Sequence, residues 1–222
     1  MSIKISGTGS FIPENIIKND SFLNSDFYDK NGEPYPNSNQ DIIDKFESIT
    51  GIKERRYADK NHNTSDLATF ASIEAIKDAG IDKEEIDYII VAHNFGEIDY
   101  NTNQYIALPS VATLVKHKLE IKNDNCVAYD IIFGCPGWLE GVIQAKSFIS
   151  SGMAKRCLVI GADTLSRTVD KNDRDSLIFA DGAGASIVEK TNEEGGILSH
   201  KTITKAGKEA LYLFCKNSYN PK

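Results

Sequence analysis

One stretch decides the fold: YDIIFGCPGWLEGVIQAKSFISSG, residues 129–152, which joins an apolar strand to a helix through a glycine turn. Residues 126–132 form a short apolar run typical of strands in α/β sheets, and Gly134 follows where the chain must turn. Large apolar side chains then recur at helical spacing from 137 to 151, and Gly152 is placed to end the helix. The stretch predicts a buried strand, a sharp turn, and a helix that is apolar around most of its circumference.

The same alternation of strand and helix continues on both sides of this unit. Helices are expected at 41–50, from Ser65 to Gly80 and from Pro109 to about Leu119, and further strands at 2–8, 86–93, 156–161, 184–189 and 197–204. A polar stretch at 24–40 predicts a surface loop, and DGAG at 181–184 predicts a turn. Because parallel strands need crossover connections, this order predicts an α/β fold, with a mostly parallel mixed sheet layered by helices. We assign residues 1–190 to one domain and 191–222 to a last strand and a connector.

The composition excludes several classes of protein. With 41% hydrophobic and 26% charged residues, the 222-residue chain has the composition of a folded globular protein. No apolar run reaches the roughly 20 residues that a membrane-spanning helix needs, and no secretory signal is visible, so a cytoplasmic location is expected. A net charge of −7 argues against nucleic acid as a partner. The four cysteines lack metal-binding or disulfide-scaffold spacing, so no metal site is expected.

Cys135 lies in the predicted turn and is the candidate nucleophile. A cysteine at the start of a helix faces the positive end of the peptide dipoles, which favours the reactive thiolate. Pro136 suits the first helical position and has no N–H, so the amide of Cys135 itself is the local donor for a developing oxyanion. We expect the apolar helix to place the thiol at the bottom of an apolar tunnel, which suits a thioester with a long arm.

The alternative is that Cys135 is an inert core residue, because free cysteines are among the most buried side chains. For Cys126 and Cys157, which lie inside predicted strands, the core interpretation is favoured. Cys215 lies near a polar end of the chain, and we assign it no function.

Around these residues the chain resembles the ketoacyl-acyl carrier protein synthase III family of the thiolase superfamily. The resemblance is carried by GTGSFIPEN at 7–15, FESITGIKERRY at 46–57, IDYIIVAHN at 86–94, ALPSVATLV at 107–115, DIIFGCPGW at 130–138 and SGMAKRCLVIGADTLSRTVDKNDRDSLIFADGAGASIV at 151–188. Several motifs in the same order argue against chance similarity. The resemblance implies the N-terminal half of a thiolase-like fold, with a buried central helix after the nucleophile.

The resemblance also implies the chemistry. In the family, the cysteine that matches Cys135 takes an acyl group from acyl-CoA, and the acyl-enzyme condenses with malonyl-acyl carrier protein as CO2 leaves, without a cofactor. Arg174, in the NDRD segment, matches a residue that contacts the adenine region of CoA. Leu108 matches a position that reaches across the homodimer to close the partner's acyl pocket. The expected protein is a homodimeric acyltransferase of fatty-acid or related synthesis, with acyl-CoA and acyl carrier protein as partners.

The chain departs from the family pattern at several positions. Pro136 and Trp138 stand where the family has a small residue and a Phe, which predicts a different acyl pocket. Lys45 stands in place of a tryptophan that stacks on adenine, and Ala180 in place of a glycine. The family's catalytic histidine and asparagine lie in a second α/β half that these 222 residues do not include. We therefore expect a fragment or engineered half that does not condense substrates alone.

Two other functions stay open at this point. One is a non-catalytic subunit that binds acyl chains or dimerises with a complete synthase. The other is a thioester hydrolase in which His93, at the end of a predicted strand, assists Cys135. An isolated half would also expose the apolar surface that meets its second half, so we expect oligomers rather than a monomer.

Overall fold

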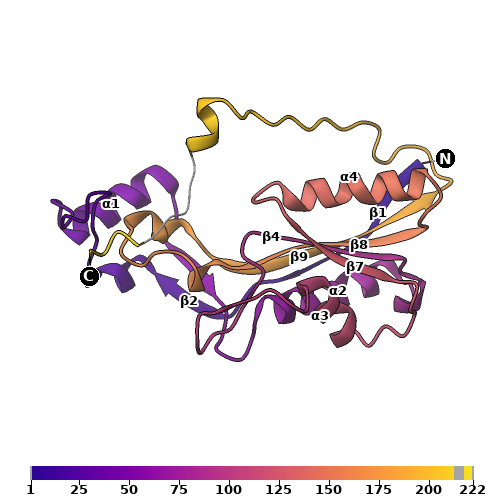
Figure 1. The fold of residues 1–222 in the computed structure, drawn as a ribbon, viewed down its shortest axis with the longest axis horizontal. Helices are drawn as coiled ribbons and strands as arrows, with labels where there is room; N and C mark the ends of the chain where they lie inside the picture. The colour runs from indigo at the N-terminus through magenta and orange to yellow at the C-terminus, as the bar shows by residue number, and fades with distance from the viewer. Residues whose placement is uncertain (1, 213–217, 222) are drawn as a thin grey trace.

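The computed structural model describes residues 2–212 and 218–221, which fold around one five-stranded sheet (Figure 1). The strand order is β1-β9-β8-β4-β7. β9 runs antiparallel to both neighbours, whereas β8, β4 and β7 pair in parallel, so four of the five strands point the same way. The predicted α/β class with a mostly parallel sheet is confirmed. The strands are β1 (Ser2–Phe11), β4 (Tyr88–His93), β7 (Val127–Ile132), β8 (Arg156–Thr164) and β9 (Asp181–Thr191).

Helices cover both faces of this sheet. α2 (Thr64–Ala79) and α3 (Val111–Lys118) lie on one face, and α4 (Gly137–Ser150) lies on the other (Figure 1). α1 (Asn39–Thr50) lies at one end of the molecule (Figure 1). None of the described helices is long and apolar enough to cross a membrane. The smaller elements are β2 (Asn15–Lys18), β3 (Glu54–Tyr57), β5 (Glu97–Ile98), β6 (Tyr105–Ile106), and the short 3-10 helices η1 (Asn19–Phe22), η2 (Lys83–Glu85), η3 (Leu165–Arg167), η4 (Arg174–Ile178) and η5 (Lys208–Leu211).

Capping residues set the starts of the first two helices. Ser38 begins α1, because its hydroxyl accepts the N–H of Asp41 at 3.2 Å. Asn63 begins α2, and the carboxylate of Asp66 accepts the N–H of Asn63 at 2.8 Å. Both helices therefore start earlier than the sequence pattern alone predicts, although their existence and their C-terminal glycines are as expected.

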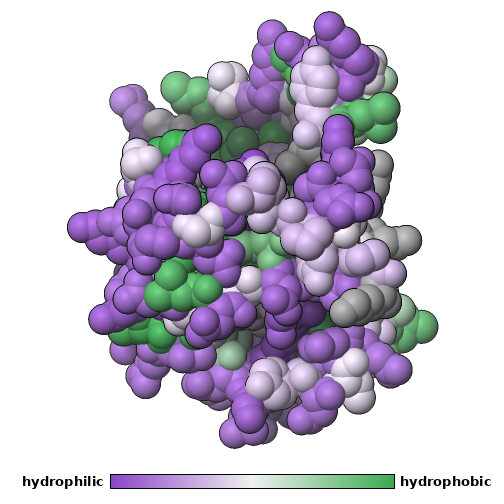
Figure 2. Space-filling model, turned by 90° about the vertical axis from the view of Figure 1, so that its left-hand side faces the viewer, coloured by the Kyte–Doolittle hydropathy of each residue, from purple (hydrophilic) through white to green (hydrophobic). Residues whose placement is uncertain are grey.

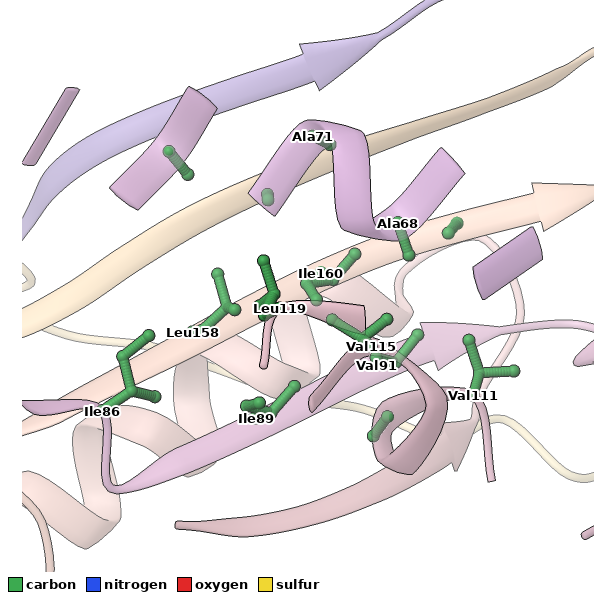
Figure 3. Close-up of a cluster of buried hydrophobic side chains, with 14 of the residues drawn as sticks. Ala68, Ala71, Ile86, Ile89, Val91, Val111, Val115, Leu119, Leu158 and Ile160 are labelled. Carbon is green, nitrogen blue, oxygen red and sulfur yellow. The ribbon is translucent and has the colours of Figure 1, made fainter. Parts of the chain in front are cut away.

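The larger hydrophobic core fills the space between the sheet and the helices α2 and α3 (Figure 3). Small alanines of α2 let the helix lie close to the branched side chains of β4 and β8. A second buried cluster joins α4 to the other face of the same strands. The sheet is thus held between two apolar layers. Residues of the first cluster include Ala68, Ala71, Ile89, Val91, Val111, Val115, Leu158 and Ile160, and those of the second include Ile90, Val142, Ala145, Ile149 and Val159.

Two glycines bring α4 close to the sheet. A Cβ atom at Gly137 would lie 2.8 Å from Cβ of Ala92, and one at Gly141 would lie 2.7 Å from Cγ1 of Val159. Both distances are shorter than real Cβ atoms allow, so a side chain at either position would push the helix outward. The absence of these side chains fixes where α4 starts above the parallel strands.

The predicted buried strand at 126–132 is the edge strand of the sheet. β7 pairs with β4 alone among the described strands, and Val127 and Ile132 are 46% and 71% exposed. An apolar run indicates a strand but does not reveal how many neighbours it has. α4 likewise buries one face only, with Leu139 exposed, because only an extended segment of the described chain, and no helix or sheet, lies along its outer side. The expectation of a helix buried around most of its circumference is wrong for these residues.

The sheet also ends differently from the prediction. DGAG at 181–184 is the start of β9, paired with β1 and β8 at once, and is not a turn. The expected strand at 197–204 is not formed; Ile197 donates its N–H to the carbonyl of Ile3 at 2.8 Å, and the chain then passes along the outer side of α4 (Figure 1). Gly195 and Gly196, both at positive φ, turn the chain before a ladder can form. The division between 1–190 and 191–222 stays a prediction.

We expect Gly141→Ala to lower the free energy of unfolding by about 1–3 kcal/mol, because the new methyl group overpacks against Val159. Urea denaturation followed by circular dichroism measures this change. Gly184→Ala is the matched control, since a Cβ atom at Gly184 meets no atom within 4 Å, and its effect should stay within about 0.5 kcal/mol. Equal effects of the two substitutions would contradict the close contact between α4 and the sheet.

Candidate functional site

Cys135 lies at the strand-to-helix corner that the sequence predicts. β7 ends at Ile132, Gly134 adopts φ +71°, and α4 begins at Gly137. The N–H of Gly137 donates to the carbonyl of Gly134 at 2.9 Å, which closes the turn around Cys135. Pro136 is the residue just before the helix rather than its first residue, and it offers no side-chain cap. The peptide dipoles of α4 therefore point at the turn that carries the thiol.

Burial separates the cysteines of the described chain. Cys135 is exposed, whereas Cys126 and Cys157 are buried. Burial raises the pKa of the Cys126 thiol to about 11 and that of Cys157 to about 12, so both are thiols at neutral pH. Cys215 lies outside the described residues. The core interpretation is therefore right for Cys126 and Cys157 and wrong for Cys135.

The expected apolar tunnel does not enclose Cys135 in the described chain. Cys135 is exposed, and Ile132 and Leu139, three residues before it and four after it, are 71% and 52% exposed. A hollow of about 330 Å³ lies beside Trp138, over small residues of β1, β8 and β9, but Cys135 does not line it. Cys135 therefore lies in an exposed segment that includes exposed apolar side chains, without an enclosing cavity in the described chain.

A polar pair lies next to the turn of Cys135, on the same face of the sheet as α4. Asn94 follows β4, and its N–H and side-chain Nδ2 donate to Oδ1 and Oδ2 of Asp163 at 2.9 and 2.7 Å. Burial raises the pKa of the Asp163 carboxyl, and the hydrogen bonds from Asn94 oppose part of that rise. A Cβ atom at Gly134 would lie 3.6 Å from Oδ1 of Asn94. The amide oxygen of Asn94 therefore lies close to Gly134, the residue that precedes Cys135.

His93 belongs to the opposite face of the sheet. Its ring is 2% exposed, and Nε2 lies 3.1 Å from Oδ2 of Asp130. The carboxylate of Asp130 also accepts the N–H groups of Val111 and Ala112 at 2.8 Å each, at the start of α3. Nδ1 of His93 is buried without a hydrogen-bond partner in the described chain. His93 therefore supports α3 through Asp130, and no contact joins it to Cys135.

Arg174 lies across a hollow of about 250 Å³ from α1. Its guanidinium stacks on the ring of Tyr35 at 4.5 Å, and its Nε lies 3.8 Å from Oδ1 of Asp175. Lys45 and Phe46 of α1 line the same hollow. The structure thus brings Arg174 and Lys45, which are far apart in sequence, into one site. The α1 end of the molecule is mainly hydrophilic, with separate small hydrophobic patches (Figure 2).

Leu108 is placed at the surface, away from any described core. It is 84% exposed and precedes Pro109 through a cis peptide bond, just before α3. Tyr105, on the neighbouring β6, is also exposed, at 54%. Both residues lie in the segment between β4 and α3. A leucine so exposed is available to another surface rather than to the core of its own chain.

Sequence reasoning missed Asn94 and Asp163, although both follow apolar strand residues in the motifs IDYIIVAHN and RCLVIGAD. A polar side chain at the carboxyl end of a parallel strand is the signal that could have found them, because ligands of α/β sheets bind at that edge. The described residues contain no group of three or more His, Cys, Asp or Glu side chains that could hold a metal ion.

Comparison with known proteins gives related sequences. The family described as 3-Oxoacyl-[acyl-carrier-protein (ACP)] synthase III matches residues 129–206. A beta-ketoacyl-[acyl-carrier-protein] synthase III of Staphylococcus haemolyticus is 37% identical over 215 residues, which cover 96% of this chain and 61% of that protein. The synthase III of Neisseria meningitidis serogroup C is 41% identical over 197 residues, which cover 88% of this chain and 55% of that protein. The chain thus spans about 60% of the length of such relatives.

Solved structures give the same result for the fold. The 3-oxoacyl-[acyl-carrier-protein] synthase III of Aquifex aeolicus superposes with a TM-score of 0.70 at 34% identity, over 87% of this chain and 55% of that one. A 3-oxoacyl-(acyl-carrier protein) synthase of Burkholderia xenovorans gives a TM-score of 0.72 at 25% identity, over 87% of this chain and 50% of that one. The sequence comparison and the structure comparison therefore both find 3-oxoacyl-acyl carrier protein synthases.

We expect iodoacetamide to modify Cys135 in the folded protein at pH 8 and to leave Cys126 and Cys157 unmodified. With thiol pKa values near 11 and 12, only roughly one molecule in a thousand or fewer carries a thiolate at these two buried sites. Peptide mass spectrometry measures each site, and denaturant should make all of them react. Equal labelling of Cys157 and Cys135 before unfolding would contradict this assignment.

Proposed function

We propose that this chain, which resembles the 3-oxoacyl-acyl carrier protein synthase III family in sequence and fold, forms the acyl-accepting part of a decarboxylating condensing acyltransferase. The observation that supports this most is the position of Cys135, exposed at the start of α4 in a turn held by Gly134. A thiol in that position faces the positive end of the helix dipole and can be reached by a substrate.

In the first step, Sγ of Cys135 forms a bond to the carbonyl carbon of an acyl thioester, and the electron pair of the carbonyl bond moves to its oxygen. The amide of Cys135 is the local donor for this oxyanion, since Pro136 has no N–H. When the carbonyl re-forms, the bond to the donor's sulfur breaks. The donor leaves as a thiolate and takes the proton that Cys135 gave up. The acyl group stays on Cys135 as a thioester.

In the second step, the bond between the α-carbon and the carboxylate of malonyl-acyl carrier protein breaks, and the carboxylate leaves as CO2. The electron pair of that bond stays on the α-carbon, which becomes the nucleophilic carbon of an enolate. That carbon attacks the acyl group on Cys135, the bond to Sγ breaks, and Cys135 returns to its thiolate form. The resemblance assigns the histidine and asparagine that stabilise the enolate to the second half of the family's fold. Acyl transfer to Cys135 is therefore the step that we assign to these residues.

Arg174 is the residue that we assign to the acyl donor. Its guanidinium shares a hollow with Lys45 and Tyr35, and a planar cation beside an aromatic ring can bind a purine or its phosphates. Two carboxylates, Asp41 and Asp175, line the same hollow and reduce its positive charge. We therefore propose acyl-CoA as a donor whose nucleotide is held chiefly by stacking on this side chain.

We further propose that the chain forms a homodimer through β7. This edge strand leaves N–H and C=O groups unpaired on one side, and its end residue Ile132 is 71% exposed. Leu108, 84% exposed, lies in the segment between β4 and α3, and β4 neighbours β7 in the sheet. A second copy seated against β7 would cover these apolar side chains and bring Leu108 to the acyl site of its partner.

Of the two other functions, the hydrolase has less support. Nε2 of His93 lies 3.1 Å from Oδ2 of Asp130, on the face of the sheet that α3 covers, whereas Cys135 lies in the turn that leads into α4, the helix on the other face. A non-catalytic acyl-binding subunit would differ from the proposed enzyme in forming no bond to Cys135. Mass measurement separates these cases.

Incubation with acyl-CoA should increase the intact mass of the chain by one acyl group, and Cys135→Ala should abolish the increase. The wild-type chain alkylated beforehand at Cys135 is the matched control and should also stay unmodified. Hydroxylamine should remove the adduct, because a thioester is cleaved by it. An adduct of equal yield in Cys135→Ala, or none in the wild-type chain, would contradict the proposed acyl transfer.

Sedimentation velocity should report a dimer for the wild-type chain and a monomer for Ile132→Lys, because a buried lysine at the paired edge would be left without a partner. Met153→Lys, at a site that is 62% exposed and distant in sequence from β7, is the control and should remain dimeric. A monomeric wild-type chain would argue against the interface.

A further inference from the structure

Asn94 is fixed by a two-point contact with Asp163. Its backbone N–H donates to Oδ1 of Asp163 at 2.9 Å, and its side-chain Nδ2 donates to Oδ2 at 2.7 Å. Both oxygens of the carboxylate are thus used by one residue. Since a carboxylate only accepts hydrogen bonds, Nδ2 must face Asp163, and the amide oxygen of Asn94 must face the other way.

The amide oxygen of Asn94 faces the turn that carries Cys135. Oδ1 would be 3.6 Å from a Cβ atom at Gly134, which is ordinary contact distance. Gly134 has φ +71°, in the left-handed region, and Cys135 follows it directly. The hydrogen bonds of Asn94 to Asp163 thus set the direction of its amide oxygen.

The face of the sheet supports the same arrangement. Side chains alternate along a strand, so Asp163 of β8 lies on the same face as Gly161, and the hydrogen bond from its side chain places Asn94, just past β4, on that face too. Gly137 of α4 packs on Ala92, and a Cβ atom at Gly161 would lie 3.3 Å from Cβ of Trp138. The first turn of α4 therefore covers these two strands just before they reach Asn94 and Asp163.

We infer that Asn94 is a positioning residue for Cys135 and that Asp163 acts through it. The amide of Asn94 occupies the space beside Gly134, which keeps the backbone in the conformation that aims the thiol from the start of α4. The inference rests on the proposed function only in taking Cys135 as the reacting group, and neither residue is assigned a contact with substrate.

The test is the rate of alkylation of Cys135 by iodoacetamide, measured from neutral to alkaline pH by mass spectrometry of the whole 222-residue chain after digestion. Asn94→Ala removes the hydrogen bond from the Asn94 side chain to the Asp163 carboxylate. The rate at neutral pH should fall about tenfold, which is the scale of one hydrogen bond to a charged group, and the midpoint of the rate profile should move to higher pH. Asp163→Asn should also lower the rate. An amide at position 163 can donate as well as accept a hydrogen bond, so it no longer fixes the amide of Asn94 in one orientation. In the double variant the Asp163 substitution should cause no further loss.

Several controls separate positioning from general damage. Asn101→Ala, on an exposed loop, should leave the profile unchanged, and circular dichroism and the melting temperature report folding of every variant. Asn94→Ser is the second variant if Asn94→Ala does not fold, since its hydroxyl can donate to Asp163 but leaves the space beside Gly134 empty. The same fall in rate is expected for it.

Two results would overturn the inference: an unchanged pH profile in the Asn94 variants, or independent, additive losses from the Asn94 and Asp163 substitutions. Alkylation needs no acyl donor, so the outcome is separate from that of the proposed function. A chain that is alkylated as expected but never acylated would contradict the acyltransferase alone. A chain that is acylated, with Asn94 variants alkylated like the wild type, would contradict the positioning alone.

Discussion

The close contact between α4 and the parallel strands is the constraint on which the rest of the site depends. Gly137 and Gly141 have no side chains, and Ala92 and Val159 fill the space that those side chains would need. A helix held this close starts directly above the carboxyl ends of β4 and β8, so the chain leaving β7 must turn sharply to reach it. That turn holds Gly134 at positive φ and leaves Cys135 exposed at its corner.

The sequence was sufficient for the parts of the fold that depend on neighbouring residues. The strand, turn and helix around Cys135 follow from local spacing, and so do the glycine ends of α1 and α2. It was insufficient where the answer depends on distant residues. The apolar run of β7 is that of a covered strand, yet its place at the sheet edge is set by the strand order. The unformed strand at 197–204 was missed because two glycines at positive φ outweigh an apolar pattern.

The candidate site divides in the same way. Cys135 could be selected as a candidate from one stretch, because a cysteine at a helix start has a local signature. The pairing of Asn94 with Asp163 could not, since their hydrogen bonds join residues that are 69 positions apart on strands whose adjacency the sequence does not give. Arg174 and Lys45 likewise meet only in the folded chain. The expected apolar tunnel around Cys135 is not formed by the described residues. An apolar helix indicates that it is covered, but the pattern does not show which part of a protein covers it.

Two helices begin near the same edge of the sheet, and their N-termini are used differently. At α3, the carboxylate of Asp130 accepts the N–H groups of Val111 and Ala112, so that helix start already holds an anion. At α4, the residue before the helix is Pro136, which brings neither an N–H nor a capping side chain. The N-terminal end of the α4 dipole then points at the turn that carries Cys135. An acidic cap there would compete with a thiolate for the same N–H groups, so Pro136 before α4 leaves room for an anionic sulfur at a position that Asp130 of β7 already fills at α3.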